Sequence, residues 1–138
     1  MSLEISRDFF NAIVDHARVQ NPEEACGVIL GPIGSGKAQR LKPMINAAHS
    51  PTFYEFDSKD LLALYRELDD REEEIVVIYH SHPESEARPS RTDIAYAGEP
   101  GAHYVLVSTR QEIAPEVEFR SFRIIAGQVS EESVVLLD

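Results

Sequence analysis

The sequence predicts an α+β fold built on a mixed, mostly antiparallel sheet flanked by helices. Helical and strand-like segments alternate only loosely along the chain, and the last strand-like segments follow one another as a hairpin, which disfavours a doubly wound parallel sheet. The chain has 138 residues, is 43% hydrophobic and contains no repeat, linker or low-complexity stretch. Such a chain suits one compact domain spanning residues 1–138, and it is too short for two ordinary domains.

The N-terminal part is expected to form a helix followed by a hairpin. Apolar residues recur at helical spacing over residues 7–19, behind Ser6 as a good N-cap, and Asn21-Pro22 ends the pattern. Two short apolar runs follow, at residues 25–30 and 38–45, and a glycine-rich stretch separates them. This order predicts a strand, a loop and a second strand.

A second helix and a buried strand are expected in the middle of the chain. Asp57 and Ser58 precede five apolar residues that fall on one helical face: Leu61, Leu62, Leu64, Tyr65 and Leu68. The acidic run at residues 69–74 is typical of a solvated turn. Residues 75–79 are apolar and rich in β-branched side chains, so we expect a buried strand with His80 at its end.

The C-terminal part predicts a short helix and three more strands. Pro89-Ser90 opens a helix through Tyr96, and Glu99-Pro100-Gly101 breaks it. Apolar strands are then expected at residues 103–108, 117–125 and 129–137. The last two complete the sheet.

Charge and cysteine content exclude several classes of partner. The formal net charge is -11 and the pI is about 4.8, so the chain repels a phosphate backbone and an anionic membrane surface. No apolar run approaches the length of a membrane span or a signal sequence. The single cysteine, Cys26, forms no internal disulfide and is expected to be a buried packing residue. We therefore expect a cytoplasmic protein that binds neither nucleic acid nor membrane, with an oligomeric state left open.

The segment most informative about chemistry contains two histidines and a carboxylate. His80-Ser81-His82-Pro83 is followed, after six residues, by Ser90-Arg91-Thr92-Asp93. Histidines at i and i+2 of an extended chain point to the same side, and Asp93 can supply a third ligand from one helical turn beyond Ser90. Two imidazoles and one carboxylate leave the fourth position of a tetrahedral zinc ion free, which is typical of a catalytic site.

Plain structural roles remain open for these residues at this point. Ser90-x-x-Asp93 is also a capping box, which would use both side chains to begin the third helix. His80 or His82 alone is more often a hydrogen-bonded histidine than a ligand. Their occurrence together after a buried strand favours the metal site.

The complete pattern resembles the signature of the JAMM, or MPN-plus, zinc metalloproteases. In that family a His-x-His-Pro segment is followed by Ser-x-x-Asp, and a glutamate lies upstream in a Glu-x-Cys-Gly-like segment. Glu24-Ala25-Cys26-Gly27 is similar to that segment. The resemblance implies a cytidine-deaminase-like fold with one zinc ion held by His80, His82 and Asp93. It also implies that Glu24 acts on the attacking water and that Ser90 steadies the oxyanion.

Each implied role is chemically reasonable for these residue types. Zinc lowers the pKa of a bound water to about 7 and polarises a carbonyl, so a neighbouring carboxylate can take up the proton and pass it to the leaving amine. A fixed hydroxyl such as that of Ser90 can donate to the developing alkoxide. The residues alone do not separate Glu24 from its neighbour Glu23, an acid in the same loop. The family pattern selects Glu24.

Four segments look like the bacterial Mec-type enzymes, namely residues 50–54, 79–82, 89–93 and 103–110. Those enzymes release cysteine from a ubiquitin-like (β-grasp) sulfur carrier ending in Gly-Gly, during cysteine biosynthesis. The resemblance thus implies hydrolysis of the amide between the carrier's C-terminal glycine and an attached cysteine. The alternatives are a general deconjugating or C-terminal trimming isopeptidase, and a catalytically silent MPN scaffold that binds proteins.

The remaining motifs give weaker evidence about function. Residues 31–37 fit a phosphate-binding loop up to Lys37, but Ala38 replaces the hydroxyl that binds magnesium and no helix follows, so a hairpin loop is expected. His16 and His49 have no partner at ligand spacing and are expected to be ordinary boundary or surface residues. His103 begins a strand and is a further candidate to approach the site.

Overall fold

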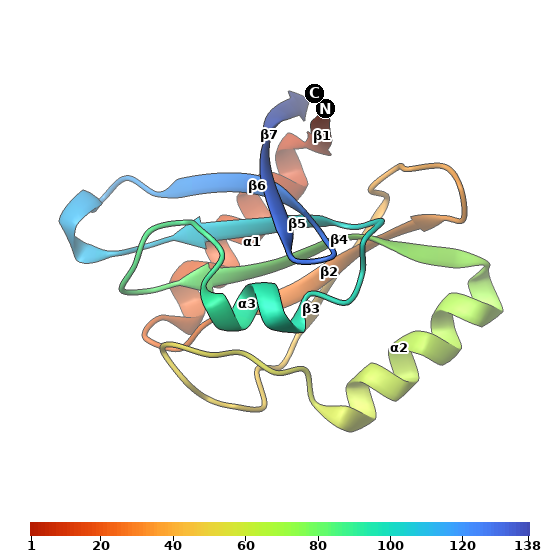
Figure 1. Cartoon of the computed structure of the whole chain (residues 1–138), viewed down its shortest axis with the longest axis horizontal. Coiled ribbons are helices and arrows are strands. Elements are labelled where there is room, and N and C mark those ends of the chain that lie inside the picture. The colour runs from red at the N-terminus through yellow and green to blue at the C-terminus, as the bar shows by residue number, and fades with distance from the viewer.

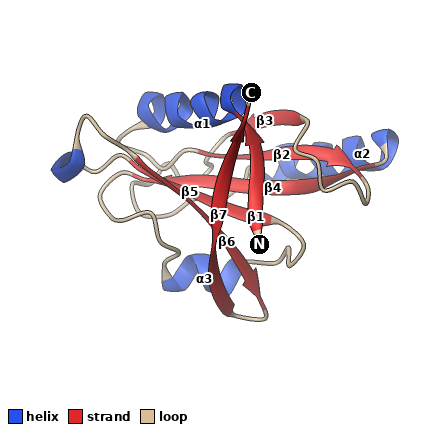
Figure 2. Ribbon diagram, turned by 90° about the horizontal axis from the view of Figure 1, so that it is seen from above, coloured by secondary structure: helices blue, strands red, loops and turns tan.

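A computed structural model describes residues 1–138 and shows a curled seven-stranded sheet with helices on both faces (Figures 1 and 2). The strands are β1 (Ser2–Ser6), β2 (Cys26–Pro32), β3 (Arg40–Met44), β4 (Glu73–His82), β5 (His103–Ser108), β6 (Glu118–Ile125) and β7 (Gln128–Leu137). The helices are α1 (Arg7–Gln20), α2 (Ser58–Arg71) and α3 (Arg91–Tyr96), with a 3₁₀ turn, η1 (Gln111–Ile113).

The sheet is mixed and mostly antiparallel, as the sequence predicts. Its strand order is β1-β7-β6-β5-β4-β2-β3, and only the β1/β7 and β4/β5 pairs are parallel. The expected hairpin forms, because β2 and β3 pair antiparallel around the glycine-rich turn, where Gly34 and Gly36 adopt positive φ. No helix begins at this turn, so the loop lacks the context of a phosphate site.

Two apolar layers cover the two faces of the sheet. Figure 2 shows α1 and α3 on opposite sides. Ile13, Val14 and Ala17 of α1 are buried with the alternate side chains of the central strands. Leu64 and Leu68 of α2 pack in the other layer, against which Ile94 of α3 and its C-cap residue Ala97 also lie. The functional residues described below belong to this second face.

The helix ends agree with the sequence signals. Ser6 caps α1 by accepting a hydrogen bond from Phe9 N at 3.1 Å, and the helix ends just before Asn21-Pro22. The Asp57 side chain caps α2 by accepting from the backbone N–H groups of Lys59 and Asp60. Both caps satisfy donors that the first turn of a helix leaves free.

Three details differ from the sequence expectations. The acidic run at 69–74 is not one solvated turn: α2 continues to Arg71, Glu72 alone turns in the left-handed region, and β4 begins at Glu73. His80 does not end its strand, because pairing with β5 keeps β4 extended through His82. Strand β1 was not expected, although Leu3 and Ile5 alternate as buried residues, because it is short and its partner β7 lies at the far end of the chain.

Candidate metal centre

The two histidines of β4 meet on the face covered by α2 and α3. His80 and His82 are two residues apart on an extended strand, so their side chains leave the sheet on the same side. Their Nε2 atoms lie 3.2 Å apart, and the two residues are 2% and 6% exposed. Parallel pairing with β5 holds this part of β4 straight, with His80 opposite Leu106 and His82 opposite Ser108.

Asp93 completes a three-atom cluster from the first turn of α3. Its Oδ2 atom lies 3.1 Å from His80 Nε2 and 3.2 Å from His82 Nε2. The same oxygen accepts a hydrogen bond from Ser90 N at 2.8 Å, and Ser90 Oγ accepts from Asp93 N at 3.0 Å. The capping box and the cluster therefore coexist, and the box fixes the rotamer that aims Asp93 at the histidines.

The spacing of these three atoms fits a tetrahedral metal ion. Zinc binds imidazole nitrogen and carboxylate oxygen at about 2.0–2.1 Å, so two ligand atoms of a tetrahedron lie about 3.3 Å apart. The three observed separations are 3.2 Å between His80 Nε2 and His82 Nε2, 3.1 Å between His80 Nε2 and Asp93 Oδ2, and 3.2 Å between His82 Nε2 and Asp93 Oδ2. Two nitrogens and one oxygen also match the donor set that zinc prefers at catalytic sites.

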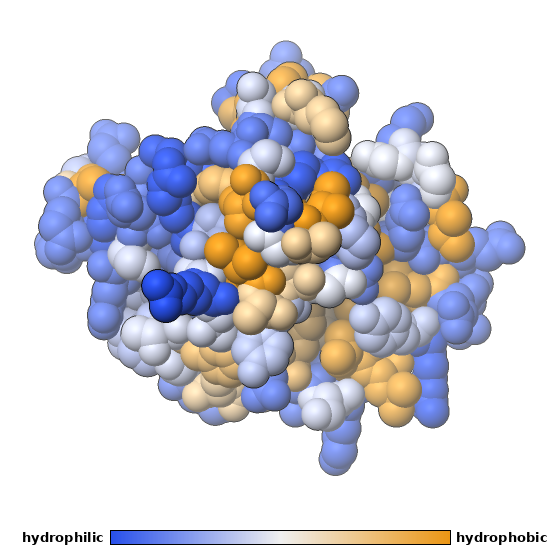
Figure 3. Space-filling model, in the orientation of Figure 1, coloured by the Kyte–Doolittle hydropathy of each residue, from blue (hydrophilic) through white to orange (hydrophobic).

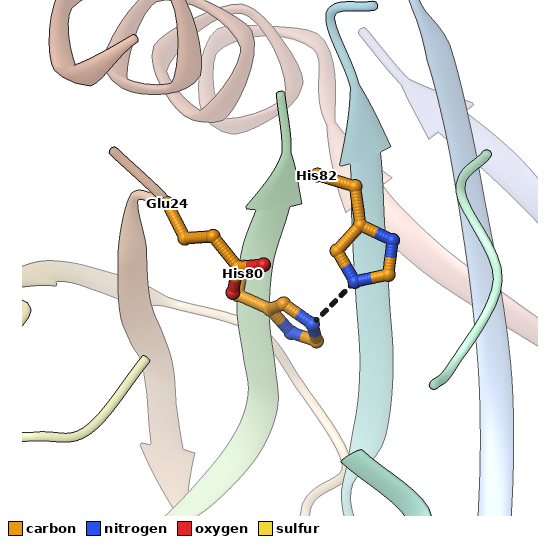
Figure 4. Close-up of side chains that lie close together, drawn as sticks. All are labelled: Glu24, His80 and His82. Carbon is orange, nitrogen blue, oxygen red and sulfur yellow. Dashed lines mark hydrogen bonds between the residues drawn. The ribbon is translucent and has the colours of Figure 1, made fainter. Parts of the chain in front are cut away.

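Glu24 lies beside this cluster, just before β2. Its ligand atom and those of His80 and His82 all lie within 4.8 Å of one another, and all three residues are buried (Figure 4). Glu24 is 3% exposed, and its Oε1 atom has no hydrogen-bond partner. A buried acid with a free oxygen aimed at a cluster of ligand atoms is suited to accept a proton from a water molecule there.

Backbone contacts hold Glu24 in place. Ala25 N donates to Ser81 Oγ at 2.8 Å, and Ser81 N donates to Ala25 O at 3.0 Å, so the residue between the two histidines ties down the residue after Glu24. Asn46 Nδ2 also donates to Glu24 O at 3.0 Å. Sequence reasoning missed Ser81 and Asn46, and only the position of Ser81 inside the histidine segment offered a signal.

The two imidazole rings are oriented in different ways. His82 Nδ1 lies 2.7 Å from the backbone oxygen of Glu86, the kind of outer contact that fixes the ring of a metal-binding histidine. His80 Nδ1 is buried without a partner, but the His80 ring stacks on the ring of Tyr54, with centroids 4.4 Å apart and planes 26° apart. Tyr54 lies in the loop before α2, and nothing in the sequence assigned it to the site.

Burial and mutual charge shift the pKa values within the cluster. Burial raises the pKa of Glu24 to about 8. Burial also lowers the pKa of His80, which Asp93 opposes only in part. Burial would lower the pKa of His82, but the hydrogen bonds that its ring donates to Asp93 and to the Glu86 carbonyl, together with the nearby negative charges, outweigh burial and raise the pKa. Burial would raise the pKa of Asp93, but hydrogen bonds from both histidines bring it well below its ordinary value. Asp93 is therefore the charged member of the ligand set.

A groove beside the cluster is lined by residues of α2, of α3 and of the loop before α2, and Asp93 is among them. Its volume is about 430 Å³, and nine of its fifteen lining residues are hydrophobic. Phe53, Tyr54, Tyr96 and Tyr104 supply aromatic walls. Figure 3 shows hydrophobic side chains at the centre of this face and over the α2 side. Such a groove suits a largely apolar ligand, and Asp93 belongs both to its lining and to the cluster.

The other residues that the sequence singled out do not belong to the His-His-Asp cluster. Cys26 is fully buried in the core, and burial raises the pKa of its thiol to about 12, as expected for a packing residue. His103 does not approach the cluster, because it pairs with Val77 at the opposite end of β5 and contacts Glu132 through Nδ1 at 2.6 Å. His49 is an exposed residue paired with Glu23.

No helix of the chain is both long and apolar enough to cross a membrane.

The curled mixed sheet and the His-His-Asp cluster with an adjacent buried glutamate define a JAB/MPN-type domain whose buried cluster is suited to bind a metal ion. The comparison with protein families agrees: the model of prokaryotic homologues of the JAB domain matches residues 6–125, and the chain belongs to this family. The resemblance to the JAMM proteases is thereby confirmed.

Relatives match over nearly all of the chain. The CysO-cysteine peptidase of Mycobacterium tuberculosis is 52% identical over 136 residues, which cover 99% of this chain and 92% of the relative. The desampylase of Haloferax volcanii is 32% identical over 111 residues, which cover 77% of this chain and 80% of the relative. The protein is thus a homologue of two peptidases of the JAMM class.

Solved structures share the fold. A protein of Desulfitobacterium hafniense superimposes with a TM-score of 0.82 at 26% identity, covering 100% of this chain and 94% of that one. A JAB1/MPN domain protein of Archaeoglobus fulgidus has a TM-score of 0.58 at 20% identity, covering 97% of this chain and 98% of that one. The second likeness concerns the fold alone.

Proposed function

We propose that this chain is a zinc-dependent peptidase that releases cysteine from the C-terminal glycine of a ubiquitin-like sulfur carrier. The observation that carries the proposal is the convergence of His80, His82 and Asp93 next to the buried carboxylate of Glu24. Identity of 52% to a CysO-cysteine peptidase over the whole chain supports the substrate class. Retention of every motif residue argues against a silent scaffold, the non-enzymatic alternative.

In this proposal His80, His82 and Asp93 hold one zinc ion. A bound zinc ion lowers the pKa of water to about 7 and polarises the scissile carbonyl. Glu24 takes the proton of the attacking water and then delivers it to the leaving amine, a role that its buried position and free Oε1 atom support. In the metal-free chain, burial raises the pKa of Glu24 to about 8, so this side chain is able to hold a proton inside the protein.

Ser90 is proposed to stabilise the oxyanion. Its Oγ atom accepts the N-cap hydrogen bond from Asp93 N, and this leaves the hydroxyl proton free to donate. Ser90 is exposed, so the proton is accessible to a substrate carbonyl. The capping role and the catalytic role therefore use different parts of the same hydroxyl.

The carrier is proposed to enter by its C-terminal Gly-Gly tail. Glycines have no side chains, so such a tail can approach the cluster closely in an extended form. The aromatic groove that has Asp93 in its lining would hold the residues before the two glycines. A carrier of this kind requires no large recognition insertion, which agrees with the small size of the chain.

Two arginines support a free amino acid as the leaving group. Arg88 and Arg91 flank Ser90 in a chain of formal net charge -11, and both are exposed. Neither forms an ion pair with an acid of the chain. A cysteine leaving group carries an α-carboxylate that an arginine can bind, whereas a lysine side chain in an isopeptide bond carries none. Similarity to the desampylase keeps general deconjugation as the second candidate.

The direct test is intact mass spectrometry of a Gly-Gly-ending carrier extended by one cysteine, incubated with the zinc-loaded protein. We expect the mass of the carrier to fall by one cysteine residue, and a chelator should prevent this loss. The same carrier joined to a lysine side chain is the comparison substrate. Cleavage of the lysine conjugate alone would replace the first candidate by the deconjugating isopeptidase.

A further inference from the structure

The short acidic loop between β4 and α3 provides the outer contact of His82. Glu84, Ser85 and Glu86 are exposed, yet the backbone oxygen of Glu86 lies 2.7 Å from His82 Nδ1. A metal-binding imidazole depends on such a contact, because it fixes the tautomer and aims Nε2 at the metal. The position of the Glu86 carbonyl therefore sets the orientation of the His82 ring.

Side chains from β5 and β6 hold this loop. Ser108 Oγ donates to Ser85 O at 2.5 Å, and Ala87 N donates to Glu118 Oε1 at 3.3 Å. These two anchors lie immediately before and after Glu86. The Ala87 side chain is fully buried in the apolar layer, so the loop is fastened on both sides of the carbonyl that contacts His82.

Arg110 joins the two anchors. Its Nη1 atom donates to Ser108 Oγ at 3.1 Å and forms an ion pair with Glu118 Oε1. The Arg110 and Glu118 side chains are only 17% and 22% exposed, so water screens the pair less than it would on an open surface. The ion pair orients the same oxygen that receives the Ala87 N–H group.

Strand register explains why these residues meet. His82 lies opposite Ser108 in the β4/β5 pair, and Ser108 lies opposite Glu118 in the β5/β6 pair. The three residues form one row across three strands, and the loop that follows His82 folds back over this row. Residues far apart in sequence thus surround the carbonyl that orients a metal ligand.

We infer that Glu118, together with Arg110, is a positioning residue of the metal centre that acts on His82 through the backbone of Ala87 and Glu86. The inference rests on the proposed role of His82 as a ligand. Glu118 itself touches neither substrate nor metal. Loss of its carboxylate frees the Ala87 N–H group, lets the Glu86 carbonyl move and leaves the His82 ring without a fixed orientation.

The test compares Glu118→Ala with Glu118→Gln and with Glu131→Ala as the matched control. Glutamine keeps an oxygen for Ala87 N–H but loses the ion pair, while Glu131 is an exposed acid that contacts Arg120, as Glu118 does, and has no contact with the loop. Zinc affinity is measured by competition with a chelator, and the ligand field by the visible spectrum of the cobalt-substituted protein. Exchange of the Ala87 amide is followed by NMR in the metal-free state.

We expect Glu118→Ala to weaken zinc binding about 10- to 100-fold, the usual effect of losing an outer contact of a ligand. It should also alter the cobalt spectrum and speed exchange of the Ala87 amide. Glu118→Gln should recover most of the affinity, and Glu131→Ala should stay within twofold of the parent. Ser108→Ala, which removes the other anchor, provides a second variant should Glu118→Ala not fold.

The outcomes separate this inference from the proposed function. Parent protein that binds no zinc would overturn the proposed function. The positioning role alone would be overturned if the parent protein binds zinc and both Glu118→Ala and Ser108→Ala bind it within twofold of the parent affinity. In that case their cobalt spectra would also be unchanged. A loss of affinity in Glu131→Ala equal to that in Glu118→Ala would overturn it as well.

Discussion

Gly27 lies directly against the aromatic ring of Tyr79, its partner on the neighbouring strand. A Cβ atom at Gly27 would be 2.4 Å from two ring carbons and the hydroxyl oxygen of Tyr79, a distance that real contacts do not reach. The ring has little room to move, because it is buried and its hydroxyl lies 2.7 Å from His16 Nδ1 on α1. The close approach sets β2 against β4, so that Cys26 pairs with His80 and Glu24 reaches the cluster.

We therefore expect Gly27→Ala to destabilise the protein by about 1–3 kcal/mol, the usual cost of overpacking a filled site. Thermal unfolding of the metal-free protein measures the change. The double variant Gly27→Ala with Tyr79→Leu is the control, since the smaller side chain removes the clash. A double variant that loses the full sum of the two single effects would show that the ring is not the cause.

Replacement of the Glu24 carboxylate should stabilise the metal-free protein at alkaline pH. The unfolded carboxyl titrates near its ordinary pKa of about 4.5, whereas burial raises the folded pKa to about 8. Between these values the folded chain retains a proton that the unfolded chain has lost, so the free energy of unfolding falls as pH rises. Glu24→Gln has no carboxyl group to titrate at this position, so its free energy of unfolding does not fall in this way.

The two proteins should thus be nearly equal in stability at pH 4.5, with Glu24→Gln more stable by about 4 kcal/mol at pH 8. Urea unfolding with a chelator present, at pH steps between these limits, gives the difference. Glu23→Gln, an exposed neighbour on the surface, is the control and should show no such trend. Equal stability of Glu24→Gln and parent at every pH would contradict the burial of an unpaired carboxyl.

Asp93 is expected to have two separable roles. Asp93→Ala should lose bound zinc and also destabilise the chain by about 1 kcal/mol, because it removes one half of the capping box. Asp93→Asn keeps an oxygen that accepts from Ser90 N–H, so it should recover the stability of the helix cap. It removes the charge of the carboxylate ligand, so it should still lose zinc. Metal analysis and thermal unfolding without metal measure the two effects. Stoichiometric zinc in Asp93→Ala would leave Asp93 with the capping role alone.

Recognition of the leaving group by Arg91 gives a substrate-dependent expectation. Arg91→Ala should lower kcat/KM about tenfold on a carrier ending in cysteine, because an ion pair with the α-carboxylate is lost. On the same carrier ending in cysteine amide, the parent and the variant should have equal kcat/KM. Arg71→Ala, at the far end of α2, is the control. An equal effect of Arg91→Ala on acid and amide would exclude a contact with the carboxylate.

The sequence was sufficient for the features that depend on short-range spacing. His80 and His82 share a face because they are two residues apart, and Ser90 and Asp93 meet because they lie in the first turn of one helix. The caps at Ser6 and Asp57 are equally local. Such features follow from the geometry of one strand or one helix.

Features that depend on strand register could not be derived from the residues themselves, and Glu24 was selected only by the family pattern. Glu24 meets the histidines because β2 pairs with β4, and Glu118 reaches the loop after His82 because two further strands align it. His103 begins the strand β5, but the parallel register places it at the end away from the cluster. No pattern within a single segment specifies which residues of distant strands lie opposite one another.

The central claim is that three residues hold the metal while Glu24 moves the proton. It is tested most directly by measuring bound zinc and turnover together in Glu24→Gln. We expect one zinc ion per chain, as in the parent, and a fall in kcat of at least about a hundredfold, in the range that general acid–base catalysis contributes. Turnover equal to that of the parent, with zinc bound, would remove Glu24 from the mechanism, and loss of zinc would make Glu24 a ligand instead.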